Sequence, residues 1–298
     1  MQRLDLAPLA PHVRELLQHI GAEADKAGVR IFIVGGVVRD LLLGVPVSDI
    51  DIVLEGDAPA FARRLAGQLS AAVRVHTPFR TAVLTFKDGL SLDLVTARRE
   101  SYARPGALPD IVPGTMDDDL FRRDFTVNAL ACGLNADNRG VVRDDLEGLT
   151  DLEARLIRTT YPESFRDDPT RILRAARYAA RFGFQLDALT QEALEAAVGA
   201  GAMTTITPVR YFLELGRILD EKDPAPALDL LSLWGAVRYI SYEAEDRALL
   251  VRCGAAREER LAALVHGLPP GKIDAVLTAF NLSRTAKRAI AQCLRHHP

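Results

Sequence analysis

The pattern of apolar and polar positions divides this chain into an N-terminal part with strand and helix patterns and a C-terminal part with helix patterns alone. Residues 4–28 have helical spacing and end at a glycine. β-Branched and aromatic residues predict a buried strand over Val29–Val34, and Gly35-Gly36 then leads into a short helical pattern that stops at Gly44. The next predicted elements are a strand over Asp49–Leu54, a helix over Ala58–Leu69, and strands over Arg80–Phe86 and Ser91–Thr96.

Strand patterns fade towards the middle of the chain. Between Arg98 and Thr115 three prolines and two glycines disfavour a helix or a central strand, and they predict a mobile loop. From about Asp145 helical periodicity dominates. The sequence therefore predicts an α+β fold with a mixed head and an all-α remainder. The expected segments are a helical lead-in over 1–28, a head over 29–144, a neck over 145–205 and a short helical body over 206–298.

Composition narrows the function classes. The formal net charge of −3 and an isoelectric point near 6.1 argue against a uniformly basic nucleic-acid binder, so any nucleic acid must meet a local patch. The apolar runs are too short for a membrane span, and the N-terminus has no apolar signal core, so we expect a cytoplasmic protein. The scattered cysteines and histidines do not match the ligand spacings of zinc sites.

Two acidic residues alternate with isoleucines at the start of the second predicted strand. A strand turns Asp49 and Asp51 to one face, about 6.6 Å apart along the chain. Neighbouring carboxylates are costly unless cations neutralise them, which suits a Mg²⁺ site for phosphoryl transfer. A bare pair of this kind is also compatible with an exposed strand end.

The glycine pair ahead of these acids favours the metal-site interpretation over an exposed strand end. Gly35 and Gly36 close a buried strand, so exposed N–H groups and the following helix N-terminus form a cradle for phosphate, to which Arg39 adds donors. Alone, a Gly-Gly pair usually marks a tight turn. Followed at once by the acidic pair, it favours a nucleotide site.

A third pattern lies in the helical part. Asp168 and Pro169 are helix-start signals and Gly183 is a stop signal, which predicts one helix over 169–182. Four arginines form a ridge on one side of it: Arg171, Arg174, Arg177 and Arg181. Such a ridge is often a solvated face, but after a phosphate-transfer pattern a ligand-binding role is the better interpretation.

These patterns carry a family resemblance. VGGVVRDLLLG followed by SDIDIV resembles the head domain of class II tRNA nucleotidyltransferases and bacterial poly(A) polymerases, in the DNA polymerase β superfamily. FRRDFTVNALA is similar to the second signature of that family, and DLEGLTDLEARLIRT to the stretch joining head and neck. RDDPTRILRAARYAARFGF resembles the nucleobase-reading segment. Together the similarity covers roughly residues 31–184.

The resemblance implies roles for individual residues. Asp49 and Asp51 would be catalytic and hold Mg²⁺, and Asp93 would be the third carboxylate, although one acid in an apolar strand also suits a sheet edge. Asp124 and Asn128 would orient Arg123 or the ribose, or Asn128 would satisfy nearby backbone. The residues that would contact the incoming nucleotide are Gly35, Gly36, Arg39, Arg123, Arg174 and Arg177.

The resemblance also assigns selection of the base to Asp168 and Arg171. Cytosine and adenine both present an amino group beside a ring-nitrogen acceptor, so a carboxylate accepts from the first and a guanidinium donates to the second. Guanine and uracil invert this pattern. The protein itself would then replace a nucleic-acid template.

The implied function is template-independent addition of C and/or A to the tRNA 3′ end from CTP and/or ATP, with release of pyrophosphate. A poly(A) polymerase of the same family is the nearest alternative, and a silent RNA-binding module or a transferase for another substrate is further away. The untruncated loop at Arg98–Thr115 favours addition of A. The sequence leaves open whether CCA, CC or A is added, and also the oligomeric state; no obligate protein partner is evident.

The last hundred residues are short for the body and tail of this family and have no clear motif. The sequence therefore does not indicate how this region would bind RNA. Basic residues here would suit an RNA backbone, but ordinary solvated surface is the simpler interpretation for each: Arg210, Arg217, Lys272, Arg284, Lys287 and Arg288.

Overall fold

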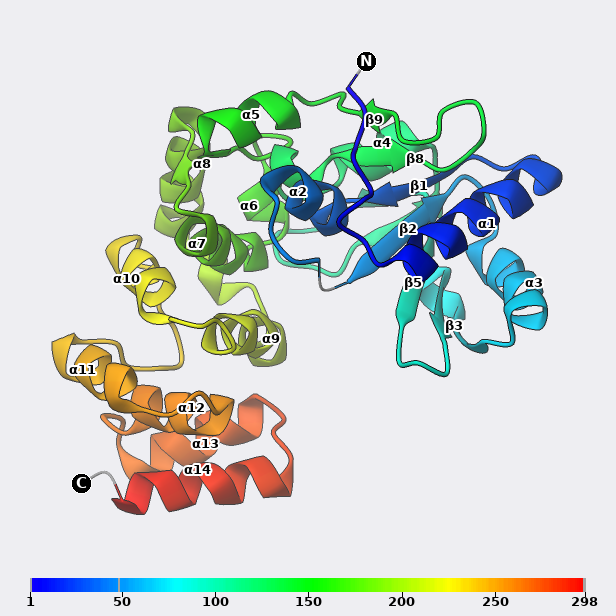
Figure 1. Cartoon of the computed structure of the whole chain (residues 1–298). Coiled ribbons are helices and arrows are strands. Elements are labelled where there is room, and N and C mark those ends of the chain that lie inside the picture. Colours follow the sequence, from blue (N-terminus) through cyan, green and yellow to red (C-terminus); the bar gives the residue numbers. More distant parts are fainter. Residues whose placement is uncertain (1, 48, 297–298) are drawn as a thin grey trace. The chain divides into compact units, whose positions relative to one another are not determined.

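The computed structural model describes residues 2–47 and 49–296, which form two compact units. The first unit comprises Met1–Ser101 and Pro109–Tyr161, and the second comprises Tyr102–Leu108 and Pro162–Pro298. The first contains the sheet and the second is almost entirely helical (Figure 1). The predicted α+β class is therefore correct.

A seven-stranded mixed sheet forms the first unit, in the order β3-β4-β5-β2-β1-β8-β9. Strands β2 and β5 pair parallel, whereas β1 with β2 and β4 with β5 pair antiparallel. The elements are α1 (Pro11–Ala27), β1 (Ile31–Val34), α2 (Gly36–Leu43), β2 (Ile50–Leu54), α3 (Ala58–Leu69), β3 (Ala72–His76), η1 (Thr77–Phe79), β4 (Thr81–Thr85), β5 (Ser91–Thr96), β6 (Arg98–Ser101), β7 (Asp110–Pro113), α4 (Met116–Phe121), η2 (Thr126–Asn128), β8 (Ala131–Gly133), β9 (Val142–Arg143), α5 (Gly148–Ala154) and β10 (Leu156–Ile157).

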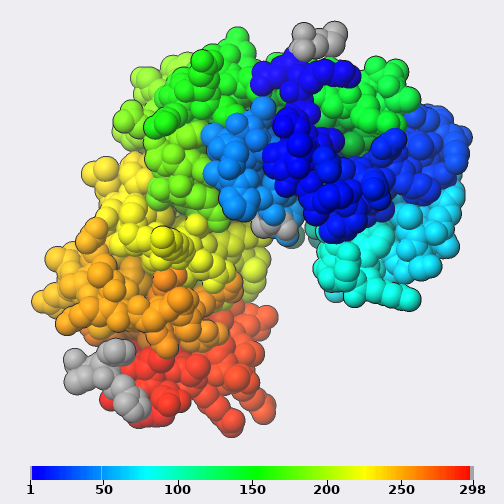
Figure 2. All heavy atoms as spheres, viewed as in Figure 1, coloured from blue at the N-terminus to red at the C-terminus, as the bar shows by residue number. Residues whose placement is uncertain are grey.

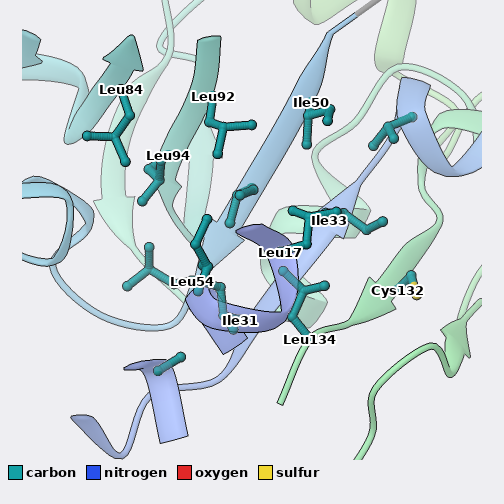
Figure 3. Close-up of a cluster of buried hydrophobic side chains, with 14 of the residues drawn as sticks. Leu17, Ile31, Ile33, Ile50, Leu54, Leu84, Leu92, Leu94, Cys132 and Leu134 are labelled. Atoms are coloured by element: carbon teal, nitrogen blue, oxygen red, sulfur yellow. The ribbon is translucent and has the colours of Figure 1, made fainter. Parts of the chain in front are cut away.

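Alternation along the strands builds a core on each face of this sheet. On one face the side chains of Ile33, Ile52 and Leu94 are fully buried in a cluster that includes residues of α1 and α3 (Figure 3). On the other face Val53 belongs to a smaller cluster with residues of α4. The second face is thus only partly covered by apolar packing, which leaves room on it for polar side chains.

Two expectations about the first unit were wrong, and one strand was missed. The N-terminal helix begins at Pro11, not at residue 4, because the preceding segment pairs with 140–142 through Leu4 N–H and Gly140 O. Strand β3 was not predicted. The segment expected to be a mobile loop contains the hairpin of β6 and β7. A two-stranded ribbon tolerates Pro113 at its end, where no ladder hydrogen bond is lost.

The second unit consists of helices, with β11 (Gln185–Leu186) as its one short strand among the described residues. Within it α7 packs against α9 and α10, and α12 packs against α14. The helices are α6 (Ser164–Asp167), α7 (Thr170–Phe182), α8 (Ala188–Gly199), η3 (Ala202–Thr204), α9 (Pro208–Leu219), α10 (Ala225–Leu233), α11 (Ala244–Arg252), α12 (Arg257–Val265), α13 (Pro270–Ala279) and α14 (Arg284–His296).

The division by contacts differs from the expected segments. The first unit extends to Tyr161, so it includes α5 and β10 beyond the expected end of the head at 144. In addition, residues 102–108 belong to the helical unit. The separation of neck and body within the second unit stays a prediction. None of the helices in the described part of the chain combines the length and apolar character of a membrane span.

Candidate functional site

The predicted carboxylates lie on the two parallel strands at the centre of the sheet. Asp51 of β2 and Asp93 of β5 are direct register partners, so their side chains lie on the same face. Asp49 immediately precedes β2 and is exposed. Ile50 and Ile52 are buried in the core on the opposite face. The predicted separation of an acidic face from an apolar face is therefore confirmed for Asp51, whereas Asp49 precedes the strand in which it was predicted to lie.

The acidic face favours a bound cation. Partial burial raises the pKa of Asp51, and Asp93 and Asp49 add to this increase against the opposing charge of Arg123. The pKa of Asp93 is also raised, first by loss of hydration and then by the charge of Asp49. Both shifts mean that the ionised carboxylates are less stable here than in water. A divalent ion removes this cost.

The glycine pair forms the start of α2. Gly35 has φ 71° and ψ −124°, a conformation that side chains disfavour, and it caps α2. A Cβ built on Gly35 would lie 2.6 Å from Nη1 of Arg123. Glycine is thus required here twice, by the backbone conformation and by the close approach of Arg123. The turn presents the N-terminus of α2 beside a guanidinium, as an anion site requires.

Arg39 is held in a buried network next to this turn. Its guanidinium donates to Asp40, with Nη2 2.7 Å from Oδ1, and to Oδ1 of Asn128. Asn128 Nδ2 in turn donates to Oδ1 of Asp124 at 3.0 Å. The side chain of Asn128 contacts Arg39 and Asp124 and, within the described residues, makes no hydrogen bond to backbone. Its role in orienting Arg123 or the ribose stays a prediction. Arg39 is 4% exposed, so any contact with phosphate would require it to act at the edge of this network.

Arg123 is oriented by an acid that the sequence analysis missed. Asp119 of α4 is fully buried and accepts from Nη2 of Arg123 at 2.8 Å and from Nη2 of Arg122 at 2.6 Å. Nη1 of Arg123 also donates to the backbone oxygen of Asn128. Arg122 also forms an ion pair with Glu100 of β6, in which Nη1 lies 3.1 Å from Oε1. Arg123 is therefore fixed between the glycine turn and a buried anion.

Replacing Asp119 by asparagine should destabilise the first unit. Burial alone would raise the pKa of Asp119, but the charges of Arg123 and Arg122 outweigh it and hold the pKa below its ordinary value. The ion cluster thus contributes stability above the ordinary aspartate pKa and loses it as the pH falls through the lowered value. At pH 7 the substitution leaves two partly buried cations without their shared anion, which costs about 3–5 kcal/mol.

Urea unfolding of the Asp119→Asn protein measures this effect. Asp117→Asn is the matched control on the same helix, because the Asp117 side chain is 73% exposed and its ion pair with Arg143 should contribute at most about 1 kcal/mol. Equal unfolding free energies for the two variants would show that Asp119 does not hold the cluster together.

The predicted base-reading residues lie in the second unit, at the start of α7. The helix begins at Thr170, one residue later than predicted, and ends at Phe182 before Gly183 in the left-handed conformation. Asp168 Oδ1 accepts from the backbone N–H and the hydroxyl of Thr170, at 3.0 and 2.6 Å. Arg171 is buried and donates to Ser164 Oγ at 2.6 Å and to Tyr102 Oη at 3.4 Å. Both side chains are held in defined orientations.

Arg210 was treated as ordinary surface, yet it joins this group. Its Nη2 is 2.8 Å from Oδ1 of Asp168, and its Nη1 donates to the backbone oxygen of Gly106 at 2.7 Å. Gly106 N–H donates to Asp167 O. The segment 102–108 therefore contacts the end of α6 through Gly106 and the first turn of α7 through Tyr102, which no local sequence signal indicated.

The arginine ridge on α7 surrounds a second missed acid. Glu214 of α9 is buried and lies 3.6 Å from both Nη1 of Arg174 and Nη2 of Arg177. Arg217, another residue first treated as surface, also pairs with Glu214. Along the ridge, Arg171 and Arg177 are buried while Arg181 is exposed. A buried glutamate among three arginines leaves this region with net positive charge.

Comparisons with known proteins support the resemblance. Residues 31–158 match the family model described as the poly A polymerase head domain. The chain is 40% identical over 243 residues to the A-adding tRNA nucleotidyltransferase of Halalkalibacterium halodurans, covering 80% of this chain but 57% of that protein. It is 35% identical over 271 residues to the CCA-adding enzyme of Pseudomonas putida strain W619, covering 86% of this chain and 70% of that enzyme.

A solved structure agrees with these relatives. The Thermotoga maritima CCA-adding enzyme complexed with tRNA_CCA superposes with a TM-score of 0.82 at 30% identity, over 100% of this chain and 75% of that one. This chain thus spans little more than half the length of the Halalkalibacterium relative and about three quarters of the Thermotoga chain. By its matched head domain and these identities, the chain belongs to the class II tRNA nucleotidyltransferase family, polymerase β-like enzymes that typically use divalent metal ions.

Proposed function

We propose that this protein adds C and/or A to the 3′ end of tRNA from CTP and/or ATP and releases pyrophosphate. The observation that carries the proposal is the pairing of Asp51 with Asp93 on adjacent strands, next to a glycine turn that opens α2 beside Arg123. Carboxylates for a metal ion and donors for a triphosphate are the two requirements of nucleotidyl transfer.

Asp49 and Asp51 are the residues proposed to hold Mg²⁺. The donor set fits, because Mg²⁺ usually binds one or two carboxylates and completes its coordination with water and substrate phosphates. Among residues 2–47 and 49–296, no group of three acidic, histidine or cysteine side chains by itself forms a metal site. When bound, the ion supplies positive charge for the phosphates and the leaving pyrophosphate.

Asp93 is proposed to accept the proton of the RNA 3′-hydroxyl. Its raised pKa makes it a better proton acceptor than an ordinary aspartate. The 3′-oxygen then forms a bond to the α-phosphorus while the bond between that phosphorus and the bridging oxygen to the β-phosphate breaks. The released group is pyrophosphate, so atoms and charge balance.

The remaining site residues bind and select the nucleotide in this proposal. The N–H of Gly36 at the start of α2 and the guanidinium of Arg123 hold the triphosphate, and Arg39 supports them. Gly35 contributes the turn itself, because its own N–H donates to the backbone oxygen of Leu130 at 2.9 Å. Arg174 and Arg177 provide further positive charge for the nucleotide. Asp168 accepts from the amino group of C or A, while Arg171 donates to the neighbouring ring nitrogen.

Extension assays test this function. tRNAs that end before the CCA, after C and after CC are each incubated with Mg²⁺ and CTP, ATP or both, and product lengths are read on a gel. We expect the CC-ended tRNA to gain a single A, as the intact 98–115 segment suggests. A long ladder of A residues would instead identify a poly(A) polymerase, and a lack of extension with every tRNA would refute the proposal. A cytoplasmic location and the absence of an obligate protein partner stay predictions.

A further inference from the structure

A row of register partners continues the acidic face towards the edge of the sheet. Asp93 of β5 pairs with Val83 of β4, and Val83 pairs with Arg74 of the edge strand β3. In the next row, Val95 pairs with Thr81 and Thr81 with His76. Because register partners point to the same face, Arg74 and His76 lie on the face that carries the carboxylates.

This edge of the sheet is accessible and carries the positive charge of Arg74. Arg74 and His76 are exposed, and within the described residues neither side chain makes a hydrogen bond or an ion pair. The sequences of β3 and β4, AVRVH and TAVLT, contain no acid that would neutralise them. Figure 2 shows the segment around β3 and β4, in cyan, at the surface of the first unit.

Arg74 and His76 are within electrostatic reach of Asp93. Loss of hydration and the charge of Asp49 raise the pKa of Asp93, and Arg74 and His76 both oppose that increase. Two strand spacings separate Arg74 from Asp93, which is about 10 Å between their backbones. Val83 lies between them and is partly exposed. Along this row the surface therefore presents the cation of Arg74, then the small apolar side chain of Val83, and then the carboxylate of Asp93.

The strand order places this surface opposite the phosphate cradle. In the order β3-β4-β5-β2-β1, the glycine turn follows β1, whereas Arg74 lies on β3. Asp51 and Asp93 are on the two strands in between. In a displacement at phosphorus the attacking and leaving oxygens lie on opposite sides, so the two cationic surfaces suit two different anionic substrates.

We propose that Arg74 and His76 form a subsite for the phosphodiester backbone at the 3′ end of the RNA acceptor. The phosphate nearest to a 3′-hydroxyl is one sugar away from it. A hydroxyl at Asp93 therefore brings that phosphate over Val83 and within the span of the Arg74 side chain, while the sugar covers the apolar patch. This inference rests on the proposed function and extends it to the second substrate.

The test compares Arg74→Ala with Arg63→Ala. Arg63 lies exposed on α3, whose Phe61 and Leu65 pack into the core on the opposite face, so the two variants lose the same charge on different faces. Binding of a CC-ended tRNA is measured by fluorescence anisotropy without nucleotide at several salt concentrations. Arg74→Ala should bind the tRNA several-fold more weakly, and the slope of log affinity against log salt should decrease by about 0.7 for one lost phosphate contact.

Nucleotide kinetics distinguish an RNA subsite from a triphosphate contact. KM for ATP should stay within about twofold of wild type, and Arg74→Lys, which keeps a cation, should retain most of the RNA affinity. A higher KM for ATP with unchanged RNA binding would overturn the inference by making Arg74 a triphosphate contact. Identical behaviour of Arg74→Ala and Arg63→Ala would overturn it while leaving the proposed function intact if wild type extends tRNA. Lack of extension by wild type would refute the function itself.

Discussion

Asp51→Asn should abolish nucleotide incorporation and at the same time raise the melting temperature of the protein in EDTA. The two effects have one cause. Asp51 is partly buried beside Asp93 and close to Asp49, so its negative charge is costly in the metal-free fold. Asparagine keeps the shape of the side chain but removes the charge. The repulsion that destabilises the protein without metal is then gone, together with the charge that would hold the ion.

The expected loss of activity is about a thousandfold or more, which corresponds to ~4 kcal/mol of transition-state stabilisation. Incorporation of radiolabelled ATP into tRNA measures the loss, and differential scanning calorimetry in EDTA measures the gain in stability. Mg²⁺ should raise the melting temperature of wild type and leave that of the variant nearly unchanged.

Asp88→Asn is the control for this experiment, because Asp88 is an exposed carboxylate in the turn between β4 and β5. It should change neither property appreciably. If the Asp51 variant kept wild-type turnover, the proposed metal site would be wrong. If it lost activity but also melted at a lower temperature, the carboxylate would be a structural group and not a strained functional one.

Arg171→Ala should lose selectivity for CTP and ATP over GTP and UTP more than it loses Mg²⁺ binding. Arg171 is buried and is held by Ser164 and Tyr102, so its guanidinium is oriented before any base arrives. Its removal takes away the donor to the ring nitrogen that cytosine and adenine share. A lost hydrogen bond of a charged group is worth about 1–3 kcal/mol, so selectivity should fall by roughly 10–100-fold.

Ratios of kcat/KM for the four nucleotides measure this selectivity. Arg181→Ala on the same helix is the matched control, because Arg181 is exposed and pairs with Glu221. A circular dichroism melt of each variant shows whether the helical unit stays folded. Unchanged nucleotide ratios in a folded Arg171→Ala protein would refute the role of Arg171 in base selection.

Local sequence signals were sufficient for elements whose limits depend on a few neighbouring residues. The β-branched run before Gly35 predicted β1, and alternation from Asp49 predicted which face of β2 is acidic. Pro169 and Gly183 predicted α7 to within one residue at its start. In each case the conformational preference of the residue itself, or the two-residue period of a strand, determines the outcome.

Pairing partners and buried charges were decided by the tertiary structure. Strand β3 is a short edge strand whose residues are exposed except for the partly buried Val75, and the alternation of Val73 and Val75 with polar residues was missed in the sequence analysis. Glu214 and Arg210 have the composition of solvated surface, and they are buried or half-buried because they meet Arg177 and Asp168 from other segments. Asp119 pairs with Arg122 and Arg123, three and four residues away, but it is buried because α4 packs onto the sheet through Met116 and Leu120. By itself the sequence determined the order of the main helices and strands, without β3, β6 and β7, and also the acidic pair and the glycine turn. Only the fold decided how deeply these charges are buried and which distant charges meet, because the energy of a charge depends on its distance from water and on partners that, like Asp168 and Arg210, lie far apart in the chain.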